Sequence, residues 1–257
     1  MISNKLSRLD AALAYAKLGF AVFPVQSKRA DGSCTCNNPD CKSVGKHPRT
    51  ANGLKDATKD PSTIRFWWNN AFKDSNIAVA TGAISGFFAV DVDVKHDGLK
   101  AWEDFKDDNG LDDYETPVQN TPSGGKHVLY NMPAEGKVLT KTNVLANGID
   151  IRGDGGYIVV TPSDGYNYVT EQGIGEKPLQ DAPQAVLELV VKKLIVSETD
   201  NQPTVSDCIA ETDSIVVHSY HTLKRYNEIW PVERFWDDGA LFQGATMMIS
   251  GQPKIGK

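Results

Sequence analysis

The chain has 257 residues, of which 40% are hydrophobic and 23% are charged, values typical of globular proteins with a full apolar core. No apolar run approaches the roughly 18 residues that a membrane-spanning helix needs, and the N-terminus lacks the apolar core of a signal peptide. These features exclude membrane proteins and predict a cytoplasmic location. The net charge of −6 is not the basic balance usual in nucleic-acid-binding proteins, although a total charge conceals local patches.

The N-terminal part of the sequence predicts a helix followed by a strand. Apolar residues recur at helical spacing over residues 6–18, and Gly19 supplies a C-terminal stop. A short apolar run over residues 20–25 then predicts a strand. Further along, Asp60 is expected to cap a second helix with Pro61 at its first position. This helix carries two tryptophans whose spacing places them in the core.

A polar loop over residues 34–47 contains three cysteines and a histidine: Cys34, Cys36, Cys41 and His47. Because the loop has no apolar periodicity to order it, ligands at this density favour a closed tetrahedral Zn²⁺ site. Disulfides are the competing interpretation, but the cytoplasm is reducing and three is an odd number. In a third interpretation, His47 belongs to a substrate-facing Gly-Lys-His-Pro turn, and the fourth ligand lies elsewhere.

The most informative stretch is residues 86–94, an apolar and β-branched run that contains Asp91 and Asp93. Side chains alternate across a strand, so both carboxylates are expected on one face and the valines between them on the other. Two like charges side by side repel, and a divalent cation such as Mg²⁺ would remove that cost. The alternative is a strand end whose aspartates face water. A strand at residues 76–81 and a turn at residues 82–86 predict an antiparallel hairpin with this run.

Two later stretches also bring polar side chains to strands. Ser123–His127 leads directly into a strand; its glycines would let the backbone approach an anion, and its side chains supply donors suited to phosphate. The alternative is an ordinary glycine-rich hairpin turn. Asp150 lies between two isoleucines on a further strand, where it either joins the other carboxylates or forms a pair with Arg152. Convergence of the three stretches on one sheet face would create a site for metals and phosphates.

Together these residues resemble the archaeo-eukaryotic primase superfamily, specifically the bifunctional primase–polymerase domains of plasmids, phages and mobile elements. The pattern there is an hD-x-D strand, an S-G-G-x-H strand and a later aspartate, which appear here as Val90–Asp93, Ser123–His127 and Ile149–Asp150. The resemblance implies an α+β fold with mixed or antiparallel sheets flanked by helices, including an RRM-like part and the zinc-binding loop. It also implies a catalytic domain over residues 1–195.

By this resemblance, Asp91, Asp93 and Asp150 hold two divalent ions, Mg²⁺ or Mn²⁺. One ion would activate the attacking 3′-hydroxyl, and the other would steady the triphosphate and its leaving pyrophosphate. The implied partners are a single-stranded DNA template, a primer and NTPs or dNTPs. The cysteine loop is similar to the zinc-binding insertion of some members and would serve structure or template handling. The implied nucleotide-binding residues are Ser123, Gly124, Gly125, Lys126, His127 and Arg152.

The composition changes beyond residue 195. Residues 196–240 are expected to form a linker with a helical segment, and residues 241–257 the truncated start of a RecA-like helicase domain. There a strand-like run enters Gly251–Lys257, which reads G-x-x-x-x-G-K and stops one residue before the Ser/Thr of a P-loop. The alternative is a coincidental glycine-rich tail. The sequence therefore predicts the N-terminal part of a phage or plasmid primase–helicase, with the helicase domain in the same full-length chain.

Three functions compete at this stage. The leading one is a DNA primase/polymerase that works by two-metal nucleotidyl transfer. The second is a catalytically silent module that binds single-stranded DNA and loads the helicase, although a silent copy would have no need for clustered carboxylates. The third is a metal-dependent nuclease that uses the same aspartates. The Ser123–His127 segment argues against a nuclease, which needs no pyrophosphate pocket.

Overall fold

The computed structural model describes residue 2 and residues 5–111 and 115–192, so the linker and helicase segments predicted for residues 196–240 and 241–257 lie outside the described residues. The chain divides into one unit over Met1–Val196 and another over Ser197–Lys257, and the described residues belong to the first. The helical elements are α1 (Arg8–Lys17), η1 (Gly53–Asp56), α2 (Pro61–Phe66), η2 (Trp67–Ala71), η3 (Lys95–Asp97), α3 (Gly98–Asn109) and α4 (Gln184–Val190). The strands are β1 (Val22–Val25), β2 (Asn76–Ala80), β3 (Phe87–Val92), β4 (Val118–Asn120), β5 (Lys126–Asn131), β6 (Lys137–Val138), β7 (Ile149–Arg152), β8 (Tyr157–Val160), β9 (Asn167–Tyr168) and β10 (Val191–Lys192).

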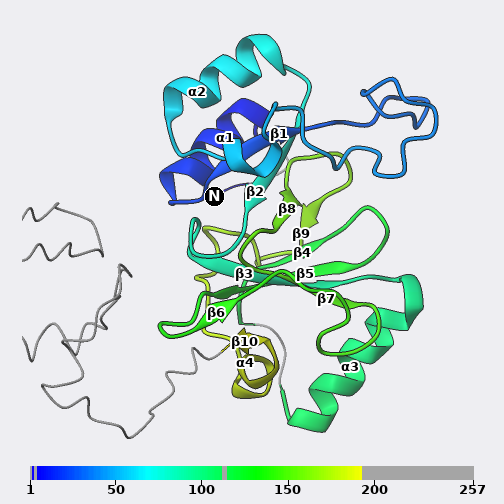
Figure 1. The fold of residues 1–257 in the computed structure, drawn as a ribbon, viewed down its shortest axis with the longest axis vertical. Helices are drawn as coiled ribbons and strands as arrows, with labels where there is room; N and C mark the ends of the chain where they lie inside the picture. The colour runs from blue at the N-terminus through cyan, green and yellow to red at the C-terminus, as the bar shows by residue number, and fades with distance from the viewer. Residues whose placement is uncertain (1, 3–4, 112–114, 193–257) are drawn as a thin grey trace, which may run out of the picture. The chain divides into compact units, whose positions relative to one another are not determined.

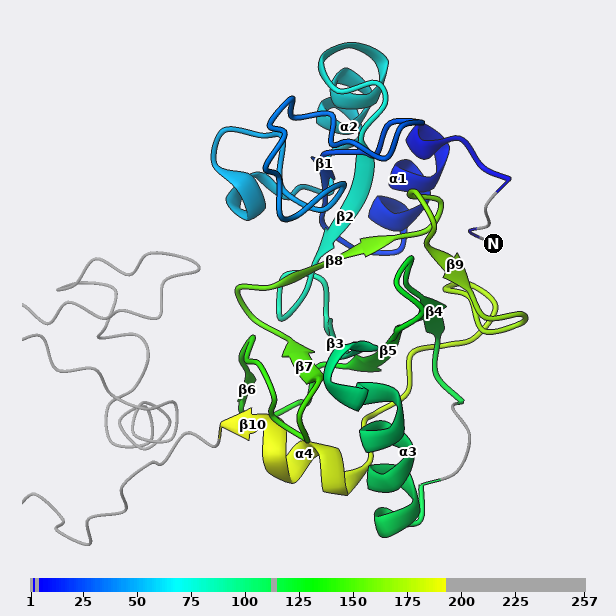
Figure 2. The same ribbon diagram turned by 90° about the vertical axis from the view of Figure 1, so that its right-hand side faces the viewer.

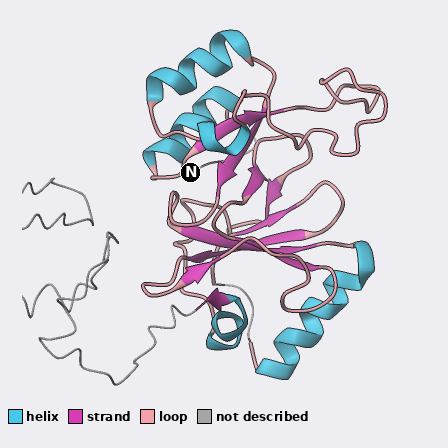
Figure 3. Cartoon of the chain, viewed as in Figure 1, coloured by secondary structure: helices cyan, strands magenta, loops and turns pink. Residues whose placement is uncertain are grey.

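The strands of the first unit form a three-stranded sheet in the order β1-β2-β8, a five-stranded sheet in the order β7-β3-β5-β4-β9, and a two-stranded ribbon of β10 and β6. The pairings between these strands are antiparallel. Helices α1 and α2 lie beside the three-stranded sheet, whereas α3 and α4 cover the far side of the five-stranded sheet (Figures 1 and 2). Figure 3 shows the same layers coloured by secondary structure. The arrangement confirms the predicted α+β class with sheets flanked by helices.

Local signals set the helix ends where the sequence predicts them. The side chain of Ser7 accepts a hydrogen bond from the backbone N–H of Asp10 at the start of α1. Gly19 follows this helix with φ of 93°, a backbone conformation that glycine adopts at little cost. Asp60 caps α2 by accepting from the backbone N–H of Thr63. Among the described residues, no helix combines the length and apolar character needed to cross a membrane.

Two apolar cores lie on opposite faces of the five-stranded sheet. In β3, Phe87 and Ala89 enter the core that includes α1 and the three-stranded sheet. Val90, which follows Ala89, enters the second core together with Trp102 of α3. Because side chains alternate along a strand, Asp91 emerges on the same face as Phe87 and Ala89, toward the three-stranded sheet.

The hairpin predicted between residues 76–81 and 86–94 is wrong. β2 pairs with β1 and β8, whereas β3 pairs with β5 and β7 in the other sheet. Gly82 and Phe87 form an isolated bridge at the point where the chain leaves one sheet for the other. A Cβ on Gly82 would lie 2.2 Å from a carboxylate oxygen of Asp154, so the turn is packed tightly against the chain next to β8. The turn at this contact connects β2 of the three-stranded sheet to β3 of the five-stranded sheet.

Candidate active site and metal-binding loop

Polar side chains from four neighbouring strands form one transverse row across the five-stranded sheet. Asp91 on β3 lies directly opposite both Asp150 on β7 and His127 on β5, and Gln119 on β4 lies opposite His127. Their apolar neighbours in the sequence, such as Val118, enter the core on the other face. Alternation therefore places the four side chains, called here the polar row, on the face toward the three-stranded sheet.

Asp91 is the centre of the polar row. Its Oδ2 accepts hydrogen bonds from Nε and Nη2 of Arg152 at 3.0 and 2.9 Å, and its Oδ1 lies 3.4 Å from Nε2 of His127. Nη2 of Arg152 also donates to Oδ2 of Asp150 at 2.9 Å. One guanidinium nitrogen thus lies between both carboxylates, which shows that their oxygens converge on a single cationic group.

The surroundings keep the Asp91 carboxylate ionised. Burial raises its pKa, but the nearby ring of His127 and the guanidinium of Arg152 outweigh burial and hold the pKa of Asp91 well below its usual range. The ring of Tyr166 packs near that of His127, with centroids 6.1 Å apart. Burial, together with the negative charge of Asp91, raises the pKa of Tyr166. Asp91 therefore stays negatively charged beside the neutral phenol of Tyr166.

The lowered pKa of Asp91 predicts a pH dependence of stability. Because this pKa is lower in the folded than in the unfolded chain, ionised Asp91 stabilises the fold at neutral pH, and the contribution is lost as the pH falls. We expect the unfolding free energy of Asp91→Asn to fall less than that of the wild type between about pH 5 and pH 2, measured by urea denaturation. The exposed Asp104→Asn on α3 controls for loss of a charge. Equal acid dependence of the wild type and Asp91→Asn would contradict the prediction.

Asp93 lies outside the polar row. β3 ends at Val92, and the exposed carboxylate of Asp93 instead accepts a hydrogen bond from the backbone N–H of Lys95 at 3.1 Å. The strand expected to carry both carboxylates therefore includes only Asp91, although the backbone N–H of Asp93 still donates to the carbonyl of Gly148 at 2.9 Å. In the described part of the chain, the aspartates do not form a group of three or more ligand atoms within metal-binding reach of one another.

The Ser123–Gly125 segment is the turn of the hairpin between β4 and β5. The backbone N–H of Thr121 donates to the carbonyl of Gly125, and that of Gly124, with φ of 90°, donates to the carbonyl of Thr121. A Cβ on Gly125 would lie 2.3 Å from the carbonyl oxygen of Val92, so only glycine allows the turn to pass this close to β3. The turn is thus held at the end of β3, close to where Asp93 follows.

The predicted nucleotide-binding residues do not all lie together. His127 belongs to the polar row, and Arg152 contacts two of its carboxylates. Ser123 and Gly124 are exposed in the turn. Lys126 begins β5 opposite Val92, so alternation places it on the other face of the sheet from His127.

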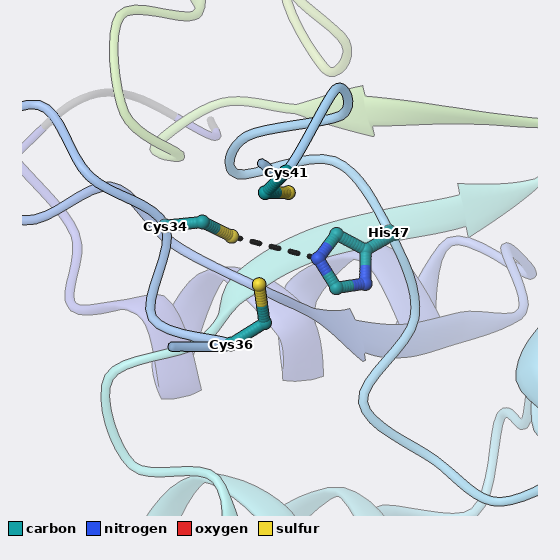
Figure 4. A group of neighbouring side chains, drawn as sticks. All are labelled: Cys34, Cys36, Cys41 and His47. Atoms are coloured by element: carbon teal, nitrogen blue, oxygen red, sulfur yellow. Dashed lines mark hydrogen bonds between the residues drawn. The ribbon is translucent and has the colours of Figure 1, made fainter. Parts of the chain in front are cut away.

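The predicted ligands of the cysteine loop do come together. The ligand atoms of Cys34, Cys36, Cys41 and His47 lie within 4.8 Å of one another, and Cys34 Sγ is 3.5 Å from Nε2 of His47. Figure 4 shows the four side chains directed toward a common centre. The three cysteines are free thiols, which removes the disulfide interpretation. Three sulfurs and one imidazole are the donor set of a structural zinc site, so this loop can bind Zn²⁺.

The thiols of the cysteine loop have pKa values that are shifted by burial and by their neighbours. Burial raises the pKa of Cys34, but hydrogen bonds from the backbone of Cys36 and Gly45 and from the side chains of Cys36 and His47 lower it to about 6. Desolvation raises the pKa of Cys41, and the neighbouring thiols Cys34 and Cys36 add to the rise. Zinc would offset the repulsion between these thiolates, because metal binding favours the deprotonated form of each ligand.

Comparison with known proteins assigns the chain to a family. Residues 12–185 match the family described as bifunctional DNA primase/polymerase, N-terminal. The chain belongs to this family. The matched segment contains the polar row, the Ser123–Gly125 turn and the cysteine loop. A comparison with curated proteins finds no match.

The cysteine loop of this primase/polymerase domain is attached to the three-stranded sheet next to the polar row. The side chain of Asn76 donates to the carbonyl of Gly45 at 3.0 Å, and the hydroxyl of Tyr157 donates to the carbonyl of Lys46 at 3.1 Å. Burial raises the pKa of Tyr157, and the nearby charge of Arg152 partly offsets that rise. Tyr157 therefore fixes the loop to β8.

Sequence analysis missed Gln119, a fully buried member of the polar row. A lone glutamine in a short strand belongs to no motif of the primase/polymerase family discussed above. The signal was present in the hairpin register, because positions 119 and 127 are equally far from Ser123 at the turn. Tyr166 was also missed, since it lies after β8 and approaches His127 only through the tertiary fold.

Proposed function

We propose that this primase/polymerase domain is a template-dependent nucleotidyltransferase that synthesises primers or extends chains on single-stranded DNA. The observation that carries the proposal is the convergence of Asp91 and Asp150 on Nη2 of Arg152, with His127 alongside. Nucleotidyl transfer depends mainly on positioning and on neutralising charge. The polar row offers carboxylates to hold cations and a donor to meet phosphate oxygens.

The donor set fits a hard divalent cation. Two carboxylate oxygens already lie 2.9 Å from one cationic nitrogen, and Mg²⁺ or Mn²⁺ prefers such oxygen ligands. We propose Asp91 and Asp150 as ligands, joined by Asp93 from the end of β3. When bound, such ions activate the attacking hydroxyl and stabilise the leaving pyrophosphate.

The remaining residues would bind the nucleotide. With Asp91 and Asp150 bound to a metal ion, the guanidinium of Arg152 would be available for phosphate, which its planar fork of donors matches well. His127 faces the same region through Nε2. Ser123 offers a hydroxyl from the exposed turn, where Gly124 leaves the backbone without a side chain, and Lys126 adds positive charge from the start of β5.

The wider context is also a proposal. The G-x-x-x-x-G-K pattern of Gly251–Lys257 supports a RecA-like helicase domain that begins at residues 241–257, after a linker at residues 196–240. The catalytic domain over residues 1–195 would then supply the nucleotide chemistry of a phage or plasmid primase–helicase in the host cytoplasm. Its partners would be the template, a primer and NTPs or dNTPs.

A primer-extension assay tests this function. The purified chain is incubated with Mg²⁺ or Mn²⁺, a single-stranded template and labelled dNTPs or NTPs, with and without an annealed primer. Product without primer would demonstrate priming and its sugar preference, whereas product only with primer would demonstrate a polymerase. No product from folded, zinc-containing protein would contradict the proposal in favour of a silent DNA-binding module. Shortening of the template would instead favour a nuclease.

A further inference from the structure

We propose that Gln119 is a positioning residue that fixes the tautomer of His127, with the ring proton on Nε2 and directed toward Asp91. The inference rests on the proposed function, because it gives His127 a defined donor for an anionic nucleotide. Gln119 is 0% exposed and His127 is 5% exposed, so neither side chain can replace its protein partners with water. Their mutual geometry therefore decides where the proton lies.

Two backbone groups fix the orientation of the Gln119 amide. The N–H of Thr161 can only donate, and its nitrogen lies 2.9 Å from Oε1 of Gln119. The carbonyl of Val159 can only accept, and its oxygen lies 2.9 Å from Nε2 of Gln119. A flipped amide would place donor against donor at one contact and acceptor against acceptor at the other. The nitrogen therefore occupies the position assigned to it.

The second N–H of this amide faces the imidazole. Nε2 of Gln119 lies 3.0 Å from Nδ1 of His127, and an amide NH₂ group has only donors to offer. Nδ1 must therefore accept through its lone pair, which leaves the proton of the neutral ring on Nε2. That nitrogen lies 3.4 Å from Oδ1 of Asp91. A directed series of contacts thus runs from the backbone of β8 through Gln119 and His127 to the carboxylate.

The directed proton gives the polar row a phosphate donor. At 3.4 Å from Asp91 Oδ1, Nε2–H is farther from its acceptor than in a good hydrogen bond, so a closer phosphate oxygen would compete for it. The other tautomer would present a lone pair to the same oxygen and repel it. Because Gln119 binds the backbone around the end of β8, this donor is set by the contact between the two sheets.

Nitrogen NMR measures the tautomer directly. The chain is labelled with ¹⁵N-histidine, and long-range proton–nitrogen correlations are recorded at alkaline pH, where histidine side chains are neutral. Loss of signals in His127→Asn identifies the ring. We expect Nδ1 of His127 to be unprotonated and Nε2 to be protonated in the wild type. A protonated Nδ1 would overturn the proposal, and this result requires no substituted Gln119.

Two variants separate positioning from general support of the fold. Gln119→Glu places an acceptor opposite Nδ1, so we expect the Nδ1 signal to become protonated and the affinity for dNTPs to fall about 10-fold. Gln119→Met loses the bond to Val159, as Gln119→Glu does, and the bond to Thr161 as well, but it offers Nδ1 no carboxylate acceptor, so Nδ1 should stay unprotonated. A folded Gln119→Glu with an unchanged Nδ1 signal would overturn the proposal. Wild-type protein with the expected tautomer but no dNTP binding would refute the proposed function alone.

Discussion

Nucleotide incorporation is expected to fall by about 10²- to 10³-fold in Asp91→Asn, the range seen when one preorganised electrostatic group is removed from an active site. Asp91 occupies the centre of the polar row, where it accepts from Arg152 and approaches His127. An asparagine keeps the shape but loses the charge that would hold a metal ion, and its NH₂ group would face either Arg152 or His127 in place of a carboxylate oxygen. Single-turnover primer extension with a labelled dNTP measures the loss.

Asp164→Asn is the matched control, because it breaks an Arg–Asp pair of similar exposure outside the polar row. The side chains of Arg8 and Asp164 are 25% and 30% exposed, against 31% and 21% for Arg152 and Asp91. We expect Asp164→Asn to incorporate nucleotide normally. Full incorporation by Asp91→Asn would instead show that its pairing with Arg152 serves only the fold.

The same assay tests the other two carboxylates. We expect a comparable loss in Asp150→Asn, whose carboxylate shares Nη2 of Arg152 with Asp91. Loss in Asp93→Asn would support its recruitment from the exposed end of β3. Full activity of Asp93→Asn would confine the metal ligands to the polar row.

Protein purified without chelators is expected to contain about one equivalent of zinc, and Cys34→Ser to lose most of it. Cys34 is the buried ligand of the loop, and its pKa of about 6 leaves the thiol ionised at neutral pH. A serine hydroxyl stays protonated there and is a much poorer ligand. Because protons compete with the metal for each ligand, zinc retention should also weaken as the pH falls.

Metal analysis of the purified protein by mass spectrometry measures this effect. Cys208→Ser is the matched control, since it removes the fourth cysteine of the sequence, which is predicted to be an ordinary thiol outside the cysteine loop. It should retain its zinc. Less than about half an equivalent in the wild type would contradict a structural zinc site.

Alternation along one strand was enough to locate the centre of the site from the sequence. Phe87, Ala89 and Asp91 fall on one face of β3, and the intervening valine enters the opposite core. Asp60 and Gly19 likewise marked helix ends, because caps and left-handed glycines act within a few residues. Such local rules carried over directly into the structure.

The contacts between distant segments were not predictable in this way. β2 is buried along its whole length, so its apolar pattern could not show that β1 and β8, not β3, are its neighbours. The position of Asp93 just beyond β3 depends on where that strand ends, a boundary that sequence patterns place only within a few residues. The contacts of Gln119 are with His127, eight residues away, and with the backbone of β8 in the other sheet.

Because the polar row runs across the strands, it also indicates where members of this family can accept insertions and deletions. Each strand contributes a side chain at one height, so extra residues in the connecting turns need not displace any of them. A one-residue insertion within β3, β5 or β7 would move each side chain beyond it to the opposite face of the sheet. A carboxylate or the imidazole would then point toward the apolar core. Length variation is therefore expected to accumulate in segments such as the cysteine loop, while the strands that carry the polar row keep a fixed number of residues.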